Sequence, residues 1–257
     1  MTLAWRPESR DMLTVHTVSQ NELDVRLAQD IAQRLTAAIV ARGFAVLSVS
    51  GGKSPVALFA ALRVMDIDWS RVRVTLVDER CVPCSHPDSN ALLVQTHLLQ
   101  DRAAKAQLVF MVDSMTLPLA PPSVQAEVAG LALTQAGSAD VLVLGMGADG
   151  HTASLFPDAP NLADALDMRN TRSCVAIELK NPPVHAPYAR ITQTLPQILS
   201  SRHIVLPLTG TDKLNTLQQA WQQATPALPI SFVLQQTQTP VALWLANSGL
   251  HSQTSLR

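Results

Sequence analysis

Short apolar runs alternate with helical patterns along most of the chain, and this alternation constrains the fold more than any other feature. The runs are nearly continuous in apolar residues, which is typical of parallel strands covered on both faces. Strands are predicted at residues 44–49, 72–77, 141–144, 174–177, 204–208, 230–234 and 241–245. Helices are predicted at residues 23–39, 55–64, 90–99, 123–134, 191–199 and 212–222. We therefore expect an α/β fold: an open, mostly parallel sheet with helices on both faces, in three Rossmann-like layers.

The composition favours one folded unit. The chain has 257 residues, of which 47% are apolar and 15% charged. This balance supplies a large buried core and excludes intrinsic disorder, which requires low hydrophobicity and high charge. The only proline-rich stretch, residues 117–122, is interpreted as a loop and not as a linker. We expect residues 1–257 to form a single α/β domain.

The charge balance excludes several classes of partner. Lys and Arg number 19 against 20 Asp and Glu, and aromatic residues make up 4%, so we expect no nucleic-acid surface. No apolar run approaches the roughly 20 residues that span a bilayer. Residues 1–12 carry charges where a signal peptide would be apolar. We therefore expect a cytoplasmic protein with no membrane partner, either a monomer or a homodimer.

The three cysteines fit a reducing compartment, because an odd number cannot pair off within the chain. Cys81 and Cys84 form a C-x-x-C pair. A zinc site would need two further ligands at comparable spacing, and Cys174 stands alone. We interpret the pair as structural and expect no metal; a thiol-redox function is the weaker alternative.

Three unusual segments each begin where a predicted strand ends. They cover residues 50–55, 78–80 and 145–151. The loops that follow parallel strands share one edge of the sheet, which is where open α/β folds bind ligands. We therefore expect the three segments to meet at one site.

The first segment reads Ser50-Gly51-Gly52-Lys53-Ser54-Pro55. It is not a nucleotide-triphosphate loop, because that motif needs a glycine where Leu47 stands. The pattern instead predicts a glycine turn before a helix, with Ser54 as the N-cap residue and Pro55 in the first turn. Exposed amides at such a turn suit a single phosphate.

The third segment contains glycine at positions 145, 147 and 150 and matches G-x-G-x-x-G. A dinucleotide site must open a helix at this point, yet Pro157 and Pro160 interrupt the chain. We interpret the segment as a tight turn that presents Asp149 and His151. A carboxylate beside an imidazole fixes its tautomer and raises its basicity, as a general base near neutral pH requires.

Two basic residues complete the set of candidates. Arg190 opens the helix predicted at 191–199, and Lys213 follows a strand and a glycine turn at Gly210. A single basic residue is usually a solvated surface charge. Their places on the expected edge of the sheet favour contact with an anion.

Taken together, these motifs resemble those of the 6-phosphogluconolactonases. The resemblance extends from Ser50 to Lys213 in consistent order. The stretches that carry it are Ser50-Gly51-Gly52 with Ser54-Pro55, Val77-Asp78-Glu79-Arg80-Cys81-Val82-Pro83, His86-Pro87-Asp88-Ser89-Asn90, residues 145–157 from Gly145 to Pro157, Arg190-Ile191-Thr192, and Gly210 with Lys213. The family shares the fold of glucosamine-6-phosphate deaminases and ribose-5-phosphate isomerases. Lys53 departs from the small residue expected at its position.

The resemblance implies an enzyme that hydrolyses 6-phospho-D-glucono-1,5-lactone to 6-phospho-D-gluconate, without cofactor or metal, in the oxidative pentose phosphate pathway. It implies His151 as the general base and Asp149 as the residue that orients it. Backbone amides at Gly147 and Gly150 are the implied oxyanion donors. The implied residues for phosphate and sugar are Gly51, Gly52, Lys53, Ser54, Asp78, Arg80, Arg190 and Lys213.

Two alternatives remain at this point. The related deaminases carry a glutamate five residues after the motif histidine, where this chain has Phe156, while the deaminases' acidic residue is matched by Asp78. Phe156 therefore argues against amino-sugar isomerisation. A sugar-phosphate-binding regulator without catalysis is the second alternative, and the intact Asp149 and His151 argue against it.

Overall fold

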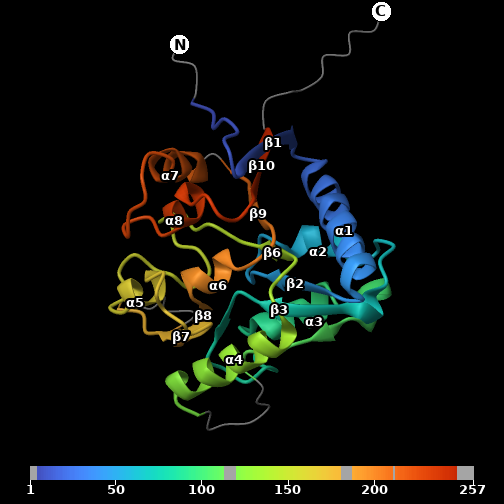
Figure 1. Ribbon diagram of the computed structural model, residues 1–257, viewed down its shortest axis with the longest axis horizontal. Coiled ribbons are helices and arrows are strands. Elements are labelled where there is room, and N and C mark those ends of the chain that lie inside the picture. The colour runs from blue at the N-terminus through green and yellow to red at the C-terminus, as the bar shows by residue number, and fades with distance from the viewer. Residues whose placement is uncertain (1–4, 113–119, 181–186, 211, 248–257) are drawn as a thin grey trace, which may run out of the picture.

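The computed structural model describes residues 5–112, 120–180, 187–210 and 212–247. A seven-stranded sheet with the order β1-β10-β9-β6-β2-β3-β5 runs through the molecule (Figure 1). Every pair of neighbours in it is parallel. Its strands are β1 (Leu13–Ser19), β2 (Ala45–Val49), β3 (Val72–Leu76), β5 (Gln107–Leu108), β6 (Val141–Val143), β9 (Ile204–Leu208) and β10 (Val241–Asn247). The open parallel α/β sheet predicted from the alternating pattern is confirmed.

The two faces of this sheet bury separate cores. Along β2, Leu47 and Val49 belong to one apolar cluster while Val46 belongs to the other, as the alternation of side chains in a strand requires. The first cluster includes residues of α1 (Leu23–Arg42), α2 (Val56–Leu62), α3 (Asn90–His97) and α4 (Pro122–Ala136). The second includes residues of α5 (Leu162–Leu166), α6 (Leu195–Leu199), α7 (Asp212–Ala220) and α8 (Ile230–Gln235). Figure 1 shows α1 on one side of the sheet and α7 and α8 on the other, so the expected three layers are present.

A second sheet of three antiparallel strands lies beside the first. Its order is β4-β8-β7, with β4 at Asp78–Arg80, β8 at Arg190–Gln193 and β7 at Cys174–Ile177. This sheet corrects the helix predicted at 191–199, because the β-branched Ile191 and Thr192 extend between two partners. The helix begins only at Leu195, after Thr194, whose hydroxyl accepts from the Gln197 N–H. Arg190 therefore lies in a strand, in register with Arg80.

The strand predicted at 230–234 is also wrong. These residues form α8, which begins directly after Pro229. A five-residue apolar run does not distinguish a buried strand from a buried helix. The prediction also omitted β1, β4, β5 and α5, each of which is short or lies at an edge.

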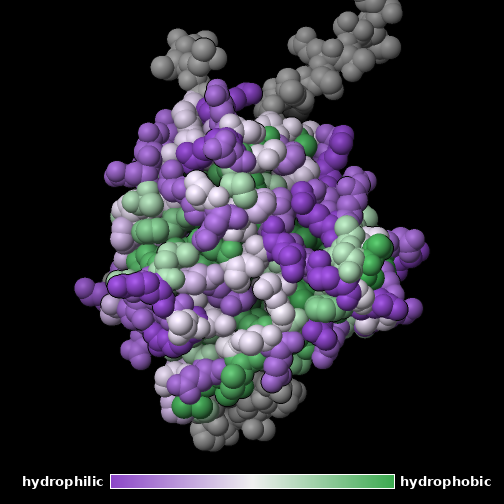
Figure 2. Space-filling model, viewed as in Figure 1, coloured by the Kyte–Doolittle hydropathy of each residue, from purple (hydrophilic) through white to green (hydrophobic). Residues whose placement is uncertain are grey.

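No helix among the described residues is long and apolar enough to cross a bilayer. One apolar area is nevertheless exposed on α4. Val124, Val128 and Leu131 are 44%, 54% and 65% exposed and share one face of that helix. Figure 2 shows a green, hydrophobic area at the lower edge of the view, where Figure 1 places α4.

Candidate active site

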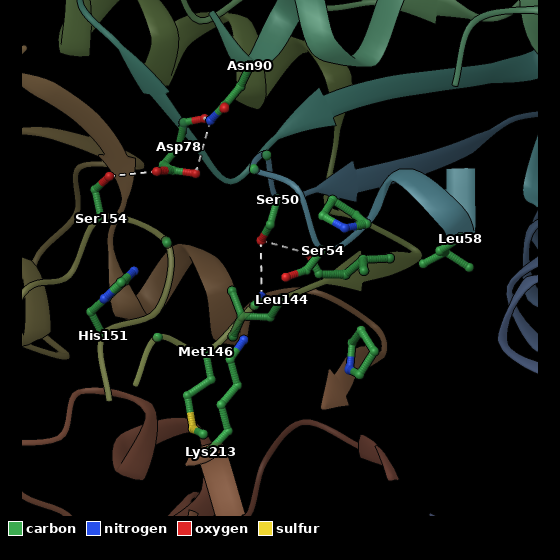
Figure 3. A pocket seen from close by; sticks show the side chains of 18 of the residues that line it. Ser50, Ser54, Leu58, Asp78, Asn90, Leu144, Met146, His151, Ser154 and Lys213 are labelled. Carbon is green, nitrogen blue, oxygen red and sulfur yellow. Dashed lines mark hydrogen bonds between the residues drawn. The ribbon is translucent and has the colours of Figure 1, made fainter. Parts of the chain in front are cut away.

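A pocket of about 310 Å³ opens at the carboxyl ends of β2 and β6. The strand order reverses here, because β3 lies on one side of β2 and β6 on the other. Ser50 joins the two strand ends: its N–H donates to Val143 O at 3.0 Å, and its hydroxyl accepts from the Gly145 N–H at 3.2 Å. The three segments predicted to converge all contribute to the lining, as Figure 3 shows. Such a volume suits a small molecule.

His151 and Asp149 form a pair at one side of this pocket. Nδ1 of His151 lies 2.5 Å from Oδ1 of Asp149. The same carboxylate oxygen accepts the His151 backbone N–H at 3.2 Å. The hydrogen bond from His151 lowers the pKa of the Asp149 carboxyl, which stays ionised at neutral pH. His151 lines the pocket, whereas Asp149 contacts His151 from outside the pocket lining. The Asp149 side chain is 54% exposed.

The glycines of this turn make room for the histidine. A Cβ on Gly147 would lie 2.3 Å from the His151 ring, so only glycine fits beneath the imidazole. The Gly147 N–H donates to His151 O at 2.9 Å, and the Gly150 N–H donates to Gly147 O at 3.1 Å. Both amides are therefore used inside the turn. The structure corrects the expectation that they face the reacting carbonyl as oxyanion donors.

The face of the His151 ring packs against Phe156, with ring centroids 4.6 Å apart. Between them the chain turns sharply at Ala153, which has a φ of 49°. A non-glycine residue in this region is uncommon and stores backbone strain. The turn places Ser154 against Asp78 while His151 stays at the pocket wall.

The glycine segment after β2 forms the opposite wall together with α7. Gly51, Gly52 and Ser54 line the pocket, and Lys213 from α7 directs its amine into it (Figure 3). Lys53 is exposed and does not line the pocket. The expected N-cap is also corrected: α2 begins after Pro55, with no side-chain cap from Ser54.

Asp78 is held at the far wall by two donors. The Ser154 hydroxyl donates to its Oδ2 at 2.6 Å, and the Asn90 Nδ2 lies 3.4 Å from its Oδ1 and 2.9 Å from its carbonyl oxygen. Asp78 is 9% exposed, and it lines the pocket together with both donors. The carboxylate is thus held in the pocket wall by Ser154 and Asn90.

Two arginines meet in this wall because β4 pairs with β8. Arg80 and Arg190 are opposite each other in the register, and both line the pocket. Burial and then the charge of Arg80 lower the pKa of the Arg190 guanidinium, while Asp78, Glu79 and Asp88 oppose this. A guanidinium stays protonated under these conditions. The pocket therefore carries three cationic side chains, from β4, β8 and α7, among the described residues that line it.

Among the pocket residues that received no role in the sequence analysis, three join different segments by side-chain hydrogen bonds. They are Ser50, Asn90 and Ser154. Each belongs to a motif quoted above, so the motifs marked their positions. Their hydrogen bonds join segments distant in sequence, and such contacts leave no local signal.

The cysteines are not arranged for thiol chemistry. Burial raises the pKa of Cys81 to about 11 and that of Cys174 to about 12, which leaves little reactive thiolate at neutral pH. Among the described residues, no group of three or more His, Cys, Asp and Glu side chains is placed to hold a metal ion.

An open parallel sheet with a cationic pocket and a carboxylate–imidazole pair at its switch point defines an α/β enzyme acting on a small anion. The family model described as glucosamine-6-phosphate isomerases/6-phosphogluconolactonase matches residues 18–244. The chain belongs to this family. A 6-phosphogluconolactonase of Mesorhizobium japonicum is 44% identical over 229 residues, which are 88% of this chain and 91% of the relative. One of Pseudomonas putida is 45% identical over 198 residues, covering 77% and 78%.

Solved structures agree with this assignment. A 6-phosphogluconolactonase from Shewanella baltica has a TM-score of 0.82 and 39% sequence identity, with 91% of this chain and 97% of that chain covered. A monomeric glucosamine-6-phosphate deaminase has a TM-score of 0.72 at 15% identity, covering 91% and 97%. The second likeness shows a shared fold alone.

Proposed function

We propose that the protein hydrolyses 6-phospho-D-glucono-1,5-lactone to 6-phospho-D-gluconate, as the second step of the oxidative pentose phosphate pathway. The observation that carries the proposal is the 2.5 Å contact between Asp149 and His151 at the wall of a cationic pocket. The relatives from Mesorhizobium japonicum and Pseudomonas putida are both named 6-phosphogluconolactonase, which supports the same substrate. That the protein works in the cytoplasm stays a prediction.

His151 is the general base of the proposed reaction. Its Nε2 takes a proton from water as the water oxygen attacks C1 of the lactone, and the C1–O5 bond then breaks. The imidazolium returns that proton to the departing ring oxygen, so the histidine ends the cycle neutral. Asp149 holds Nδ1 and stabilises the imidazolium that forms in between.

The phosphate end of the substrate lies against the glycine segment and the cations. Gly51, Gly52 and Ser54 line the same pocket as Lys213. Arg80 and Arg190 add positive charge, and Asp78 accepts a sugar hydroxyl. Binding energy from this remote phosphate orients the lactone carbonyl at His151, which raises the rate more than tight binding of the ring alone would.

The deaminase alternative needs a carboxylate at the position of Phe156. Here an aromatic ring contacts the imidazole instead, with ring centroids 4.6 Å apart, and it offers no acid. This contact favours lactone hydrolysis over ring opening of an amino sugar.

The test generates the lactone in place from glucose 6-phosphate and follows its decay against the spontaneous rate. We expect a large acceleration that disappears in His151→Ala. Ammonia release from glucosamine 6-phosphate, measured in parallel, would instead establish the deaminase reaction. Binding of 6-phosphogluconate without any acceleration would establish a non-catalytic regulator.

A further inference from the structure

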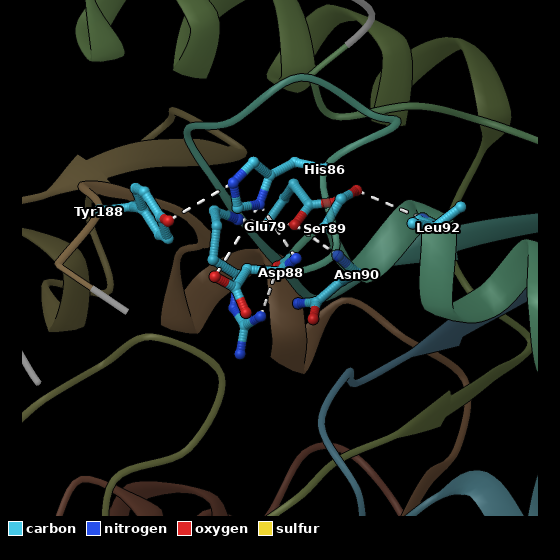
Figure 4. A network of polar contacts seen from close by, with 8 residues as sticks. Glu79, His86, Asp88, Ser89, Asn90, Leu92 and Tyr188 are labelled. Carbon is cyan, nitrogen blue, oxygen red and sulfur yellow. Dashed lines mark hydrogen bonds and ion pairs between the residues drawn. The ribbon is translucent and has the colours of Figure 1, made fainter. Parts of the chain in front are cut away.

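Glu79 is a buried carboxylate that the proposed mechanism does not use. It lies in β4 between Asp78 and Arg80 and is 1% exposed. Its Oε1 accepts the Arg80 N–H and the Asn90 N–H, both at 2.7 Å. Its Oε2 accepts the Ala91 N–H at 2.7 Å and the Ser89 hydroxyl at 3.0 Å. Figure 4 shows this network at the first turn of α3.

These four donors tie two separate segments to one side chain. The N–H groups of Asn90 and Ala91 begin α3 and have no partner within the helix, so Glu79 satisfies them from a strand. The side chain of Asn90 then reaches Asp78, and Arg80 continues toward the carbonyl oxygen of Asp88. A single carboxylate therefore fixes the backbone from which Arg80 and Asn90 enter the pocket wall.

The charge of Glu79 also acts on Arg190. Arg80 and Arg190 are paired across β4 and β8, and the charge of Arg80 disfavours a protonated Arg190 while that of Glu79 favours it. Burial raises the pKa of the Glu79 carboxyl, and its four donors oppose the rise. A buried anion whose charge favours the protonated Arg190 offsets the repulsion between the two guanidinium groups.

We propose that Glu79 is a positioning residue for anion binding, holding Arg80 and Asn90 in the pocket wall and offsetting the mutual repulsion of Arg80 and Arg190. The inference rests on the proposed function for the identity of the anion, a sugar phosphate. This role explains why position 79 carries a carboxylate and not an amide. Glutamine has one acceptor oxygen, and its amide N–H₂ would face the donors Ala91 N–H and Ser89 O–H.

Glu79→Gln tests the charge with little change in shape, and Glu127→Gln, on the exposed side of α4, is the matched control. We expect KM for the lactone and the dissociation constant for inorganic phosphate to rise roughly tenfold in Glu79→Gln, the size of a lost charge-assisted contact. We expect kcat to stay within about threefold, because His151 and Asp149 lie on another loop. A lower thermal midpoint with unchanged KM and phosphate affinity would show a purely structural role and overturn the proposal.

A milder variant covers the case in which Glu79→Gln does not fold. Ser89→Ala removes one donor to Oε2 and keeps the charge, so we expect a smaller rise in KM with kcat unchanged. Unaltered KM and phosphate affinity in Ser89→Ala would contradict the proposal.

Phosphate titration followed by ³¹P NMR measures anion binding independently of catalysis. If the wild-type protein binds phosphate but hydrolyses no lactone, the proposed reaction is refuted, and the role of Glu79 in anion binding can still be tested with the variants. If the wild-type protein binds no phosphate, both the proposed reaction and the role of Glu79 are refuted.

Discussion

Oδ1 of Asp149 contacts His151 twice, at the ring Nδ1 at 2.5 Å and at the backbone N–H at 3.2 Å. The double contact fixes both the position of the residue and the orientation of its ring. Because Nδ1 is used, Nε2 is the nitrogen left for a water molecule in the pocket. The geometry of the proposed general base is thus set by a neighbour two residues away.

Removing the base should abolish most turnover while binding persists. In His151→Ala we expect kcat to fall by roughly 10² to 10⁴, the usual contribution of general-base catalysis. Calorimetry with 6-phosphogluconate should give an affinity close to that of the wild type, since the residues proposed to hold the phosphate are unchanged. Near-wild-type kcat in this variant would remove His151 from the mechanism.

Asp149 should matter only through His151. Asp149→Asn keeps the size of the side chain and removes its charge, so we expect kcat to fall by roughly tenfold or more because the imidazolium loses its partner. The double variant Asp149→Asn/His151→Ala should be no slower than His151→Ala alone, since residues that act as a unit are not additive. A further loss in the double variant would show that Asp149 acts on the substrate independently.

Two lysines near the glycine segment provide a matched pair. Lys213 points into the pocket, whereas Lys53 is exposed and outside its lining. Lys213→Ala should raise KM roughly tenfold or more, the size of one hydrogen bond to a charged group, with a smaller change in kcat. Lys53→Ala should leave both constants unchanged. Equal effects of the two substitutions on KM would argue against a phosphate contact by Lys213.

Much of the fold was predictable from local patterns. The continuous apolar runs of β2, β3, β6, β9 and β10 were recognised because parallel strands are covered on both faces. The helix predicted at residues 23–39 is confirmed as α1, which runs from Leu23 to Arg42. The runs around residues 191 and 230 were assigned wrongly, because partners far away in the chain decide whether a short apolar segment extends or coils.

The site was predictable as a set of motifs and less so as a set of contacts. Arg80 and Arg190 were named from separate motifs. They lie opposite each other because β4 and β8 pair in antiparallel fashion, and no local sequence pattern predicts that pairing. Gly147 was expected as a backbone donor, whereas the structure requires it as a residue without a side chain beneath His151. Sequence indicates which residues are unusual, and tertiary packing decides their use.

Gly51 should tolerate no side chain. A Cβ at this position would lie 1.9 Å from Oδ1 of Asn90. The Asn90 side chain is buried, and its Nδ2 donates to Asp78, so it has little room to move. We expect Gly51→Ala to lower the free energy of unfolding by about 1–3 kcal/mol, as overpacking does, and to raise KM. Adding Asn90→Ala should recover part of the stability without recovering KM. Failure of the second substitution to restore any stability would show that the overlap with Asn90 is not the cause.

His203 should make the protein sensitive to acid. Burial lowers its pKa to about 4, assisted by the charges of Arg34 and His16 and opposed by Asp30. An unfolded histidine titrates near 6.5, so the unfolded state binds the proton first and stability falls as the pH drops from about 6.5 toward 4. Urea midpoints measured between pH 7.5 and 4.5 should therefore decline more steeply for the wild type than for His203→Gln, while His97→Gln, remote from this cluster, serves as the control. Parallel declines for the wild type and His203→Gln would show that other groups carry the acid sensitivity.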